Sequence, residues 1–227
     1  MRRLRGFTLV ELMVALFAMA LLAVMSWRGL DGMVRARETT VARSDQVLTL
    51  QVGLAQWGAD LDALAELPAT KAIEWNGRVL RLVRRDSGDA GAGVRVVGWT
   101  RRLTGTGAMW SRWESAPVST RGDLQAAWDQ ADLWAQNQGQ GNAARQVDVM
   151  PLDDWQIFFF RENAWTNPQS SDIDSSVSVV TRVGQLPSSL TRTPDGVRLV
   201  LVIPGSQAIA GTLTRDWARP TLGGNKS

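Results

Sequence analysis

The feature that most constrains this chain is an apolar stretch close to its start. From Phe7 to Ser26 the sequence runs for 20 residues with a single charged side chain, that of Glu11. A helix rises about 1.5 Å per residue, so the stretch spans ~30 Å, the hydrocarbon thickness of a bilayer. The stretch predicts a membrane-spanning helix. Glu11 needs a separate explanation, because an isolated charge at the bilayer centre costs roughly 2.5–3.5 kcal/mol.

The charges that precede the stretch predict its orientation. Arg2, Arg3 and Arg5 form a short basic leader, and basic residues stay on the cytoplasmic side of a membrane. The rest of the chain is therefore expected outside the cytoplasm, which in a bacterium is the periplasm. Two simple interpretations compete. A secretory signal peptide is disfavoured by an acid inside the apolar run, and a plain single-span anchor leaves Glu11 unexplained.

Composition excludes several classes of functional site. The 227 residues include neither cysteine nor histidine, which removes disulfides, thiolate and imidazole metal sites, and every nucleophile–histidine pair. The formal charge of +3 equals the contribution of the three leader arginines, so the remainder is close to neutral. Because no dense basic run with interleaved aromatic residues occurs, we expect no nucleic-acid partner.

Residues 5–12, RGFTLVEL, resemble the leader junction of type IV pilins and the related pseudopilins. The shared pattern is a short basic leader, a glycine, a phenylalanine, and a glutamate four residues later inside the apolar helix. The resemblance implies that prepilin peptidase cleaves between Gly6 and Phe7, and that the new amine of Phe7 is N-methylated. It also implies a filament whose core is a bundle of these helices. Glu11 would pair there with the terminal amine of a neighbouring subunit, which compensates a buried acid.

The helical pattern continues beyond the membrane, since no proline occurs before Pro68. We expect one nearly continuous helix over residues 7–66, about 90 Å long, which four glycines weaken locally by roughly 1 kcal/mol each. An apolar stripe with 4-3-4-3 spacing predicts an amphipathic face that packs on the soluble domain, with Asp45, Asp60 and Asp62 on the opposite side. Packing in the core of the chain's own domain is enough to explain the stripe. If the stripe also has a function, we expect it to pack against the helices of partner subunits. Its members are Leu50, Leu54, Trp57, Leu61 and Leu64.

After Pro68 the pattern changes to short strands. Asn76-Gly77 lies between two alternating runs and predicts a β-hairpin over residues 72–83. A short helix is expected over residues 123–136, and eleven tryptophans are expected mainly in the core. Further strands are expected over residues 93–103, 109–116, 145–152, 153–160, 177–183, 196–204 and 209–217, with loops at 104–107, 137–144 and 166–176.

These elements together predict an α+β fold. A long N-terminal pilin-type helix, whose first half spans the membrane, would pack on an antiparallel β-domain with a short inserted helix. The expected organisation is a cleaved leader (1–6), a transmembrane and filament-core helix (7–27), the amphipathic periplasmic half of that helix (28–67) and a periplasmic β-rich pseudopilin domain (68–227).

Within this class the chain looks most like the J-type minor pseudopilin of the type II secretion system. The residues that carry this likeness are 27–51, 155–165 (WQIFFFRENAW), 186–189 (LPSS) and 196–204. Closer members tend to have an Arg/Pro/Asp-rich segment after the long helix, where this chain has AELPATKAIEW. The resemblance implies a structural subunit near the tip of the periplasmic pseudopilus. Such a subunit helps to initiate assembly and the export of folded proteins.

The partners that this resemblance implies are the I-type and K-type minor pseudopilins, the major pseudopilin, prepilin peptidase and the inner-membrane assembly platform. The chain would cross the bacterial inner membrane once, with its C-terminal domain in the periplasm. A minor pilin of a type IV pilus has the same architecture and is the alternative.

An alternative of another class is a membrane-anchored periplasmic enzyme. Pairs of carboxylates could in principle serve glycoside chemistry or hold calcium, but none lies in a ligand pattern of adequate length. Lys71 lies beside no serine-bearing motif. We therefore expect no catalytic residue, no metal site and no cofactor. The pairs are Asp86 with Asp89, Asp153 with Asp154, and Asp172 with Asp174.

Overall fold

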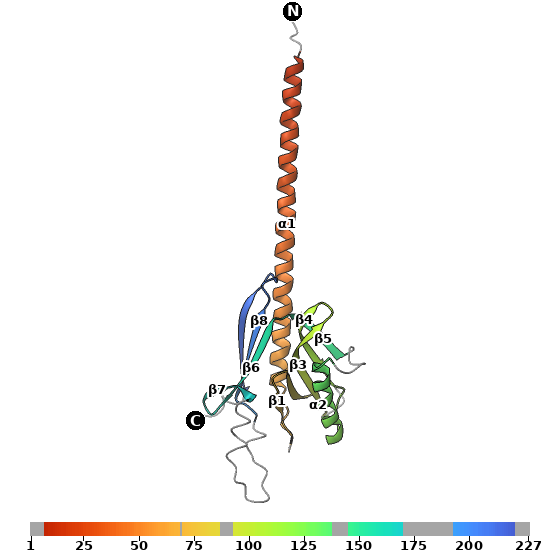
Figure 1. Ribbon diagram of the computed structural model, residues 1–227, viewed down its shortest axis with the longest axis vertical. Helices are drawn as coiled ribbons and strands as arrows, with labels where there is room; N and C mark the ends of the chain where they lie inside the picture. Colours follow the sequence, from red (N-terminus) through yellow and green to blue (C-terminus); the bar gives the residue numbers. More distant parts are fainter. Residues whose placement is uncertain (1–6, 69, 87–92, 138–144, 170–192, 221–227) are drawn as a thin grey trace, which may run out of the picture. The chain divides into compact units, whose positions relative to one another are not determined.

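The structure, a computed structural model, describes residues 7–68, 70–86, 93–137, 145–169 and 193–220 (Figure 1). The chain forms two compact units, Met1–Asp45 and Gln46–Ser227. The described part of the first unit belongs almost entirely to helix α1 (Leu9–Asp62). The second unit contains the remainder of α1, two β-sheets and helix α2 (Arg121–Ala135).

Helix α1 is the long helix expected over residues 7–66. It ends at Asp62, before Pro68, where the main chain begins to pair with a strand. After Asp62 the main chain pairs with the end of strand β2 (Val79–Arg85) instead of continuing the helix. The Ala65 amide donates to the Val83 carbonyl at 2.9 Å, and the Arg85 amide donates to the Ala63 carbonyl at 2.8 Å. These bonds satisfy main-chain groups that a helix end leaves without partners.

Five antiparallel strands form the first sheet, in the order β1-β2-β3-β4-β5. The Asn76-Gly77 hairpin is confirmed: Gly77 has a φ of 88°, and the Asn76 side chain accepts from the amides of Arg78 and Val79. Glycine suits this turn because a positive φ costs it little. Besides β2, the strands are β1 (Ile73–Trp75), β3 (Val94–Thr104), β4 (Gly107–Glu114) and β5 (Gln146–Pro151).

Four antiparallel strands form the second sheet, in the order β7-β6-β8-β9. They are β6 (Asp154–Arg161), β7 (Ala164–Thr166), β8 (Gly196–Ile203) and β9 (Gly211–Ala218). Strand β7 was not expected. Its two-residue turn places Glu162 and Asn163 at positive φ, 48° and 66°, the geometry favoured in tight hairpins. The strand expected over 177–183 and most of the loops expected over 137–144 and 166–176 lie outside the described residues.

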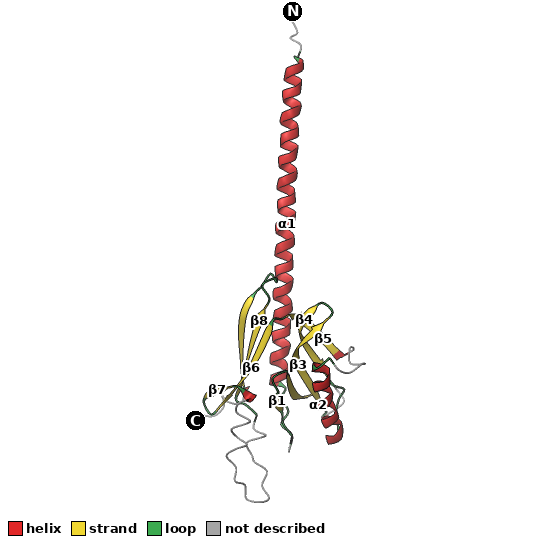
Figure 2. Ribbon diagram, viewed as in Figure 1, coloured by secondary structure: helices red, strands yellow, loops and turns green. Residues whose placement is uncertain are grey.

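The second part of α1 and both sheets share one hydrophobic core. Figure 1 shows this part of α1 between β8 on one side and β3 on the other, and buried residues of all three meet in one cluster. Helix α2 packs on the other face of the first sheet, against β2 and β3 (Figure 2). Strand β2 alternates accordingly: Leu80 and Leu82 face the first cluster, while Val79 and Val83 face α2.

Tryptophan fills much of this interior, as expected. In the described part of the chain the buried tryptophans are Trp57, Trp75, Trp99, Trp110, Trp113, Trp134 and Trp155. Trp57, Trp99 and Trp110 contact one another, with ring centroids 4.6–6.2 Å apart. The α+β fold, a long N-terminal apolar helix packed on antiparallel sheets with a short helix, is confirmed.

Candidate functional site

The start of α1 forms a capping box. Thr8 immediately precedes the helix, and Glu11 lies three residues later. The Thr8 amide and hydroxyl donate to Glu11 Oε2 at 3.4 and 3.2 Å, and the Glu11 amide donates to Thr8 Oγ1 at 3.3 Å. This reciprocal pattern satisfies donors that a helix N-terminus otherwise leaves without partners.

The capping box gives Glu11 a role that the sequence analysis missed. The T-x-x-E signature is present in the sequence at residues 8–11, but the sequence analysis assigned Glu11 to subunit docking and did not consider it as a helix cap. Inside lipid, no water can satisfy the amides of the first helical turn, so a side-chain acceptor stabilises the helix start more than it would in water. The carboxylate also lies at the positive end of the helix dipole, where a negative charge is favourable.

The described side chains of the first unit are exposed. Every described residue from Phe7 to Asp45 is exposed, including the large apolar side chains of the predicted membrane span. The helix is long and apolar enough to cross a bilayer, with a mean hydropathy of 2.4 over its most apolar 18-residue window. Surfaces of this kind are stable in lipid or against other helices rather than in water. Gly6 and the leader residues Arg2, Arg3 and Arg5 lie outside the described residues.

In the second unit, the predicted apolar stripe lies in the core of the chain's own domain. Leu50, Trp57 and Leu61 are buried in the first cluster, and Leu54 and Leu64 pack against it while partly exposed. Core packing therefore accounts for these five side chains. Their assignment to partner-helix packing stays a prediction, for which Leu54 and Leu64 keep some accessible surface.

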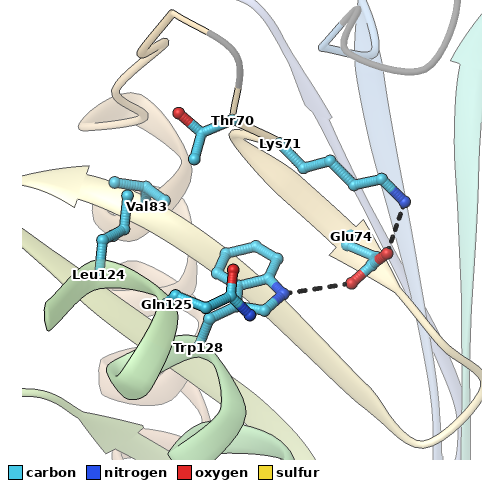
Figure 3. A pocket seen from close by; sticks show the side chains of 7 residues that line it. All are labelled: Thr70, Lys71, Glu74, Val83, Leu124, Gln125 and Trp128. Atoms are coloured by element: carbon cyan, nitrogen blue, oxygen red, sulfur yellow. Dashed lines mark hydrogen bonds and ion pairs between the residues drawn. The ribbon is translucent and has the colours of Figure 1, made fainter. Parts of the chain in front are cut away.

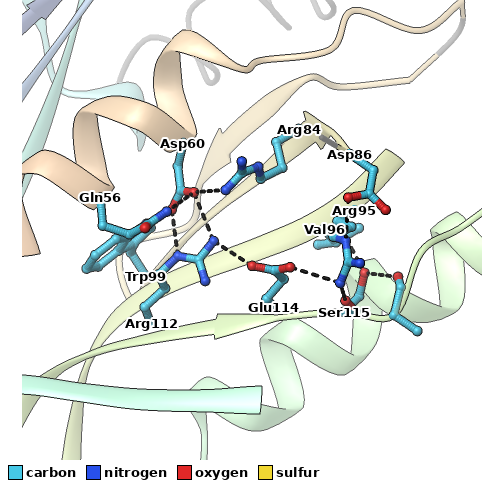
Figure 4. Close-up of polar contacts among 11 residues, drawn as sticks. Gln56, Asp60, Arg84, Asp86, Arg95, Val96, Trp99, Arg112, Glu114 and Ser115 are labelled. Carbon is cyan, nitrogen blue, oxygen red and sulfur yellow. Dashed lines mark hydrogen bonds and ion pairs between the residues drawn. The ribbon is translucent and has the colours of Figure 1, made fainter. Parts of the chain in front are cut away.

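Asp60 was expected on the solvent side of the helix, and this expectation was wrong. The residue is 0% exposed, and its carboxylate accepts five hydrogen bonds, which Figure 4 shows. Arg112 binds it through two nitrogens, with Nε 2.8 Å from Oδ2 and Nη2 2.9 Å from Oδ1. The other donors are Arg84 Nη1 at 2.6 Å, Trp99 Nε1 at 2.9 Å and Gln56 Nε2 at 2.9 Å.

The ion pairs continue across the sheet from Arg112. Its Nη2 lies 2.7 Å from Glu114 Oε2, and Arg95 then bridges Glu114 at 2.9 Å and Asp86 at 3.1 Å. Burial alone would lower the pKa of Arg112, but hydrogen bonds and the charges of Asp60 and Glu114 raise it above its ordinary value. The network fixes the second part of α1 on β2, β3 and β4, because a buried carboxylate is tolerated only with its partners in place.

A pocket of about 330 Å³ lies between α2 and the first sheet (Figure 3). Its charged side chains pair with each other: Lys71 Nζ lies 2.6 Å from Glu74 Oε1, and Trp128 Nε1 donates to Glu74 Oε2 at 3.3 Å. Burial would raise the pKa of Glu74, but its bonds with Lys71, the charge of Arg81 and the Trp128 bond lower it below the ordinary value. Glu74 is thus a paired carboxylate and lacks the raised pKa of a general acid.

The acid pairs weighed in the sequence are not assembled into a site within the described residues. Asp86 belongs to the network through Arg95, and Asp153 and Asp154 are exposed. Asp89, Asp172 and Asp174 lie outside the described residues. In the described ranges no group of three or more histidine, cysteine or acidic side chains could hold a metal ion.

Comparison with known proteins points to the same end of the chain as the capping box. The prokaryotic N-terminal methylation motif matches residues 1–27, which include Gly6, Phe7 and Glu11. No curated protein matches the chain. The motif and the apolar helix support a type IV pilin-like protein. For a type IV pilin-like protein the motif indicates processing by prepilin peptidase and assembly with other pilins into a pilus-like filament. It also suggests a membrane-anchored, structural rather than enzymatic role.

Proposed function

We propose that this chain is a minor pseudopilin of the type II secretion system, a subunit near the tip of the periplasmic pseudopilus. In this role it helps to initiate assembly and thereby the export of folded proteins. The observation that carries the proposal is the junction RGFTLVEL at the start of a helix of membrane-spanning length. The resemblance of residues 27–51 and 155–165 to the J-type subunit supports the subtype.

The proposed sequence of events begins at the junction. Prepilin peptidase cleaves after Gly6, and the new amine of Phe7 is methylated while Arg2, Arg3 and Arg5 leave with the leader. The mature helix stays in the inner membrane, with the domain from residue 68 onward in the periplasm. Thr8 and Glu11 remain in the mature chain, so the capping box survives cleavage.

Subunit docking then uses the carboxylate of Glu11. The cationic amine of an adjoining subunit supplies the charge that an acid in an apolar bundle needs. Exposure of Glu11 in the single chain agrees with a carboxylate that still has room for such a partner. The proposed neighbours are the I-type and K-type minor pseudopilins and the major pseudopilin, on the inner-membrane assembly platform.

A minor pilin of a type IV pilus is the second candidate, because the methylation motif is common to both systems and AELPATKAIEW departs from the closer pseudopilins. Deletion of the gene separates the two. The secretion role predicts that exported enzymes accumulate in the periplasm while surface pili stay normal, with rescue by the intact gene. Loss of pili with normal secretion would favour the second candidate, and normal secretion with normal pili would contradict both.

A further inference from the structure

Strand β9 leaves one long edge of the second sheet without a partner. It pairs with β8 alone, and no other described strand lies on its outer side. Its eight residues keep one regular register with β8, and most of them are exposed. An open edge of this kind presents main-chain N–H and C=O groups that lack a strand partner, and these are the groups that an added strand binds.

In the described part of the chain, the other open edges of the two sheets are shorter or interrupted. Strands β1 and β7 have three residues each. Strand β5 has six residues, but its register with β4 shifts within the strand, and its last residue is Pro151. Short strands, bulges and prolines are features by which proteins prevent edge-to-edge association. Strand β9 has none of these three features.

The register shows which main-chain groups of β9 face the open edge. The Arg219 amide donates to the Asp195 carbonyl at 2.9 Å, and these two residues continue the β8–β9 register by one position. Hydrogen-bonded pairs alternate with non-hydrogen-bonded pairs in an antiparallel ladder, so the odd-numbered residues of β9 are bonded to β8. The even-numbered residues direct their main-chain groups away from β8. These residues are Thr212, Thr214, Asp216 and Ala218.

The side chains of β9 add a charge preference to this edge. Arg215 is exposed, and no described acidic side chain pairs with it. The neighbouring Asp216 is neutralised by Arg198 through two hydrogen bonds of 2.7 Å. Leu213 and Trp217 lie on the same face as Arg215 and are partly exposed. These three odd-numbered residues would form the non-hydrogen-bonded pairs with an added strand, in which opposing side chains lie closest together.

A second copy of β9 does not supply an acid for Arg215. When two such edges pair in an antiparallel ladder, even-numbered residues bond to even-numbered residues, so Arg215 would face an odd-numbered residue of the copy. None of those residues is acidic. They are Gly211, Leu213, Arg215 and Trp217. The segments of this chain outside the described residues also lack an acid that has an apolar residue two positions away on each side.

We propose that the open edge of β9 binds an extended segment of a different protein by antiparallel strand addition. That segment has an acidic residue opposite Arg215 and apolar residues opposite Leu213 and Trp217. The partner is an extended chain because only a strand offers donors and acceptors at the spacing of the β9 edge. The charge of Arg215 favours an acidic segment and disfavours a second copy aligned with Arg215 opposite Arg215. This contact is separate from the filament contacts of the proposed function and does not depend on them.

Binding of fluorescently labelled peptides to the full-length protein in detergent micelles tests this edge. The acidic probe is the peptide TVTETVT, and the basic probe, TVTKTVT, differs only at the central residue. Fluorescence anisotropy should give the acidic probe an affinity at least about fivefold higher, because a cross-strand pair of opposite charges replaces one of like charges. A third probe is the acidic peptide with N-methyl groups on its threonine amides, which are the amides that would face β9. It should not bind, because it lacks the main-chain donors.

Variants of the chain make the result specific. Arg215→Glu should reverse the preference, whereas Arg78→Glu, at an exposed position in the turn between β1 and β2, should leave it unchanged. Thr214→Pro removes an N–H group that faces the open edge. Proline is tolerated at such a position because no hydrogen bond to β8 is lost. This variant should keep its circular dichroism spectrum and bind neither probe.

Three results would overturn the proposal. The first is equal affinity for the acidic and basic probes, or an unchanged preference in Arg215→Glu. The second is binding of the N-methylated probe, since strand addition depends on main-chain hydrogen bonds. The third is failure of the acidic probe to bind at concentrations up to about 1 mM, which includes the case in which another segment of the chain or a second copy already covers the edge.

Discussion

Glu11 contacts Thr8 in the structure, and the proposed function gives its carboxylate a second partner. Its Oε2 accepts from the amide and the hydroxyl of Thr8, and this pairing fixes the first turn of α1. The side chain stays exposed, so a second donor can approach it. Capping and subunit docking are separable, because a glutamine can complete a capping box but carries no charge.

Glu11→Gln and Glu11→Ala therefore form a matched pair. We expect both variants to insert into the membrane and to be processed, and neither to join a filament, because each lacks the charge that pairs with a neighbouring amine. Co-purification with assembled filaments measures incorporation. Full incorporation of Glu11→Gln together with failure of Glu11→Ala would assign Glu11 to capping alone and contradict the docking role.

Asp60 lies at the centre of the buried polar network, and its loss should be costly. Asp60→Asn keeps the shape but removes the charge that Arg84 and Arg112 share. We expect a loss of about 3–5 kcal/mol in the free energy of unfolding, because both arginines stay largely buried without the charge of Asp60 and Arg112 retains only its pairing with Glu114. Asp153→Asn, at an exposed position, should change it by less than about 0.5 kcal/mol. Chemical denaturation compares the two, and similar small losses would contradict the structural role of Asp60.

At the scale of elements, the helices and strands that could be predicted from the sequence were those whose signals lie in adjacent residues. Asn76-Gly77 and the alternating runs around it predicted β1 and β2, because turn type and strand periodicity depend on adjacent residues. Strand β7 was missed because its turn places Glu162, a residue without a preference for positive φ, in the left-handed region. The burial of Asp60 was missed because Arg84 and Arg112 follow it by 24 and 52 positions.

Gly53 lies where α1 packs closely against the first sheet. A Cβ at this position would lie 2.6 Å from Val149 Cγ1 and 3.0 Å from Trp110 Cζ3. Gly53→Ala is therefore expected to lower the melting temperature, although alanine favours a helix by about 1 kcal/mol. Gly58→Ala meets nothing within 4 Å and should raise it. Thermal unfolding monitored by circular dichroism measures both melting temperatures. An increase for both substitutions would contradict the close packing at Gly53.

At the scale of the whole molecule, carboxylates paired in the fold determine its response to acid. The pKa of Glu74 is lowered from 4.5 and that of Asp216 from 3.8, the latter through its hydrogen bonds with Arg198. A folded-state pKa below the unfolded value contributes stability above the unfolded value, and this stability is lost as the pH falls through the folded value. The free energy of unfolding should therefore decrease below about pH 4.5. Glu74→Gln should flatten this decrease, and an unchanged pH profile in that variant would contradict the pairing.

The proposed role of the whole molecule depends on cleavage and methylation at residue 7. The N-terminal 27 residues match the prokaryotic N-terminal methylation motif, and the leader junction within them gives the rest of the chain its proposed place in a filament. Intact-mass and N-terminal peptide mass spectrometry of the protein isolated from its native membrane tests this most directly. We expect a chain that begins at Phe7 with one methyl group on its amine. A chain that retains residues 1–6, or begins at an unmodified residue elsewhere, would contradict it.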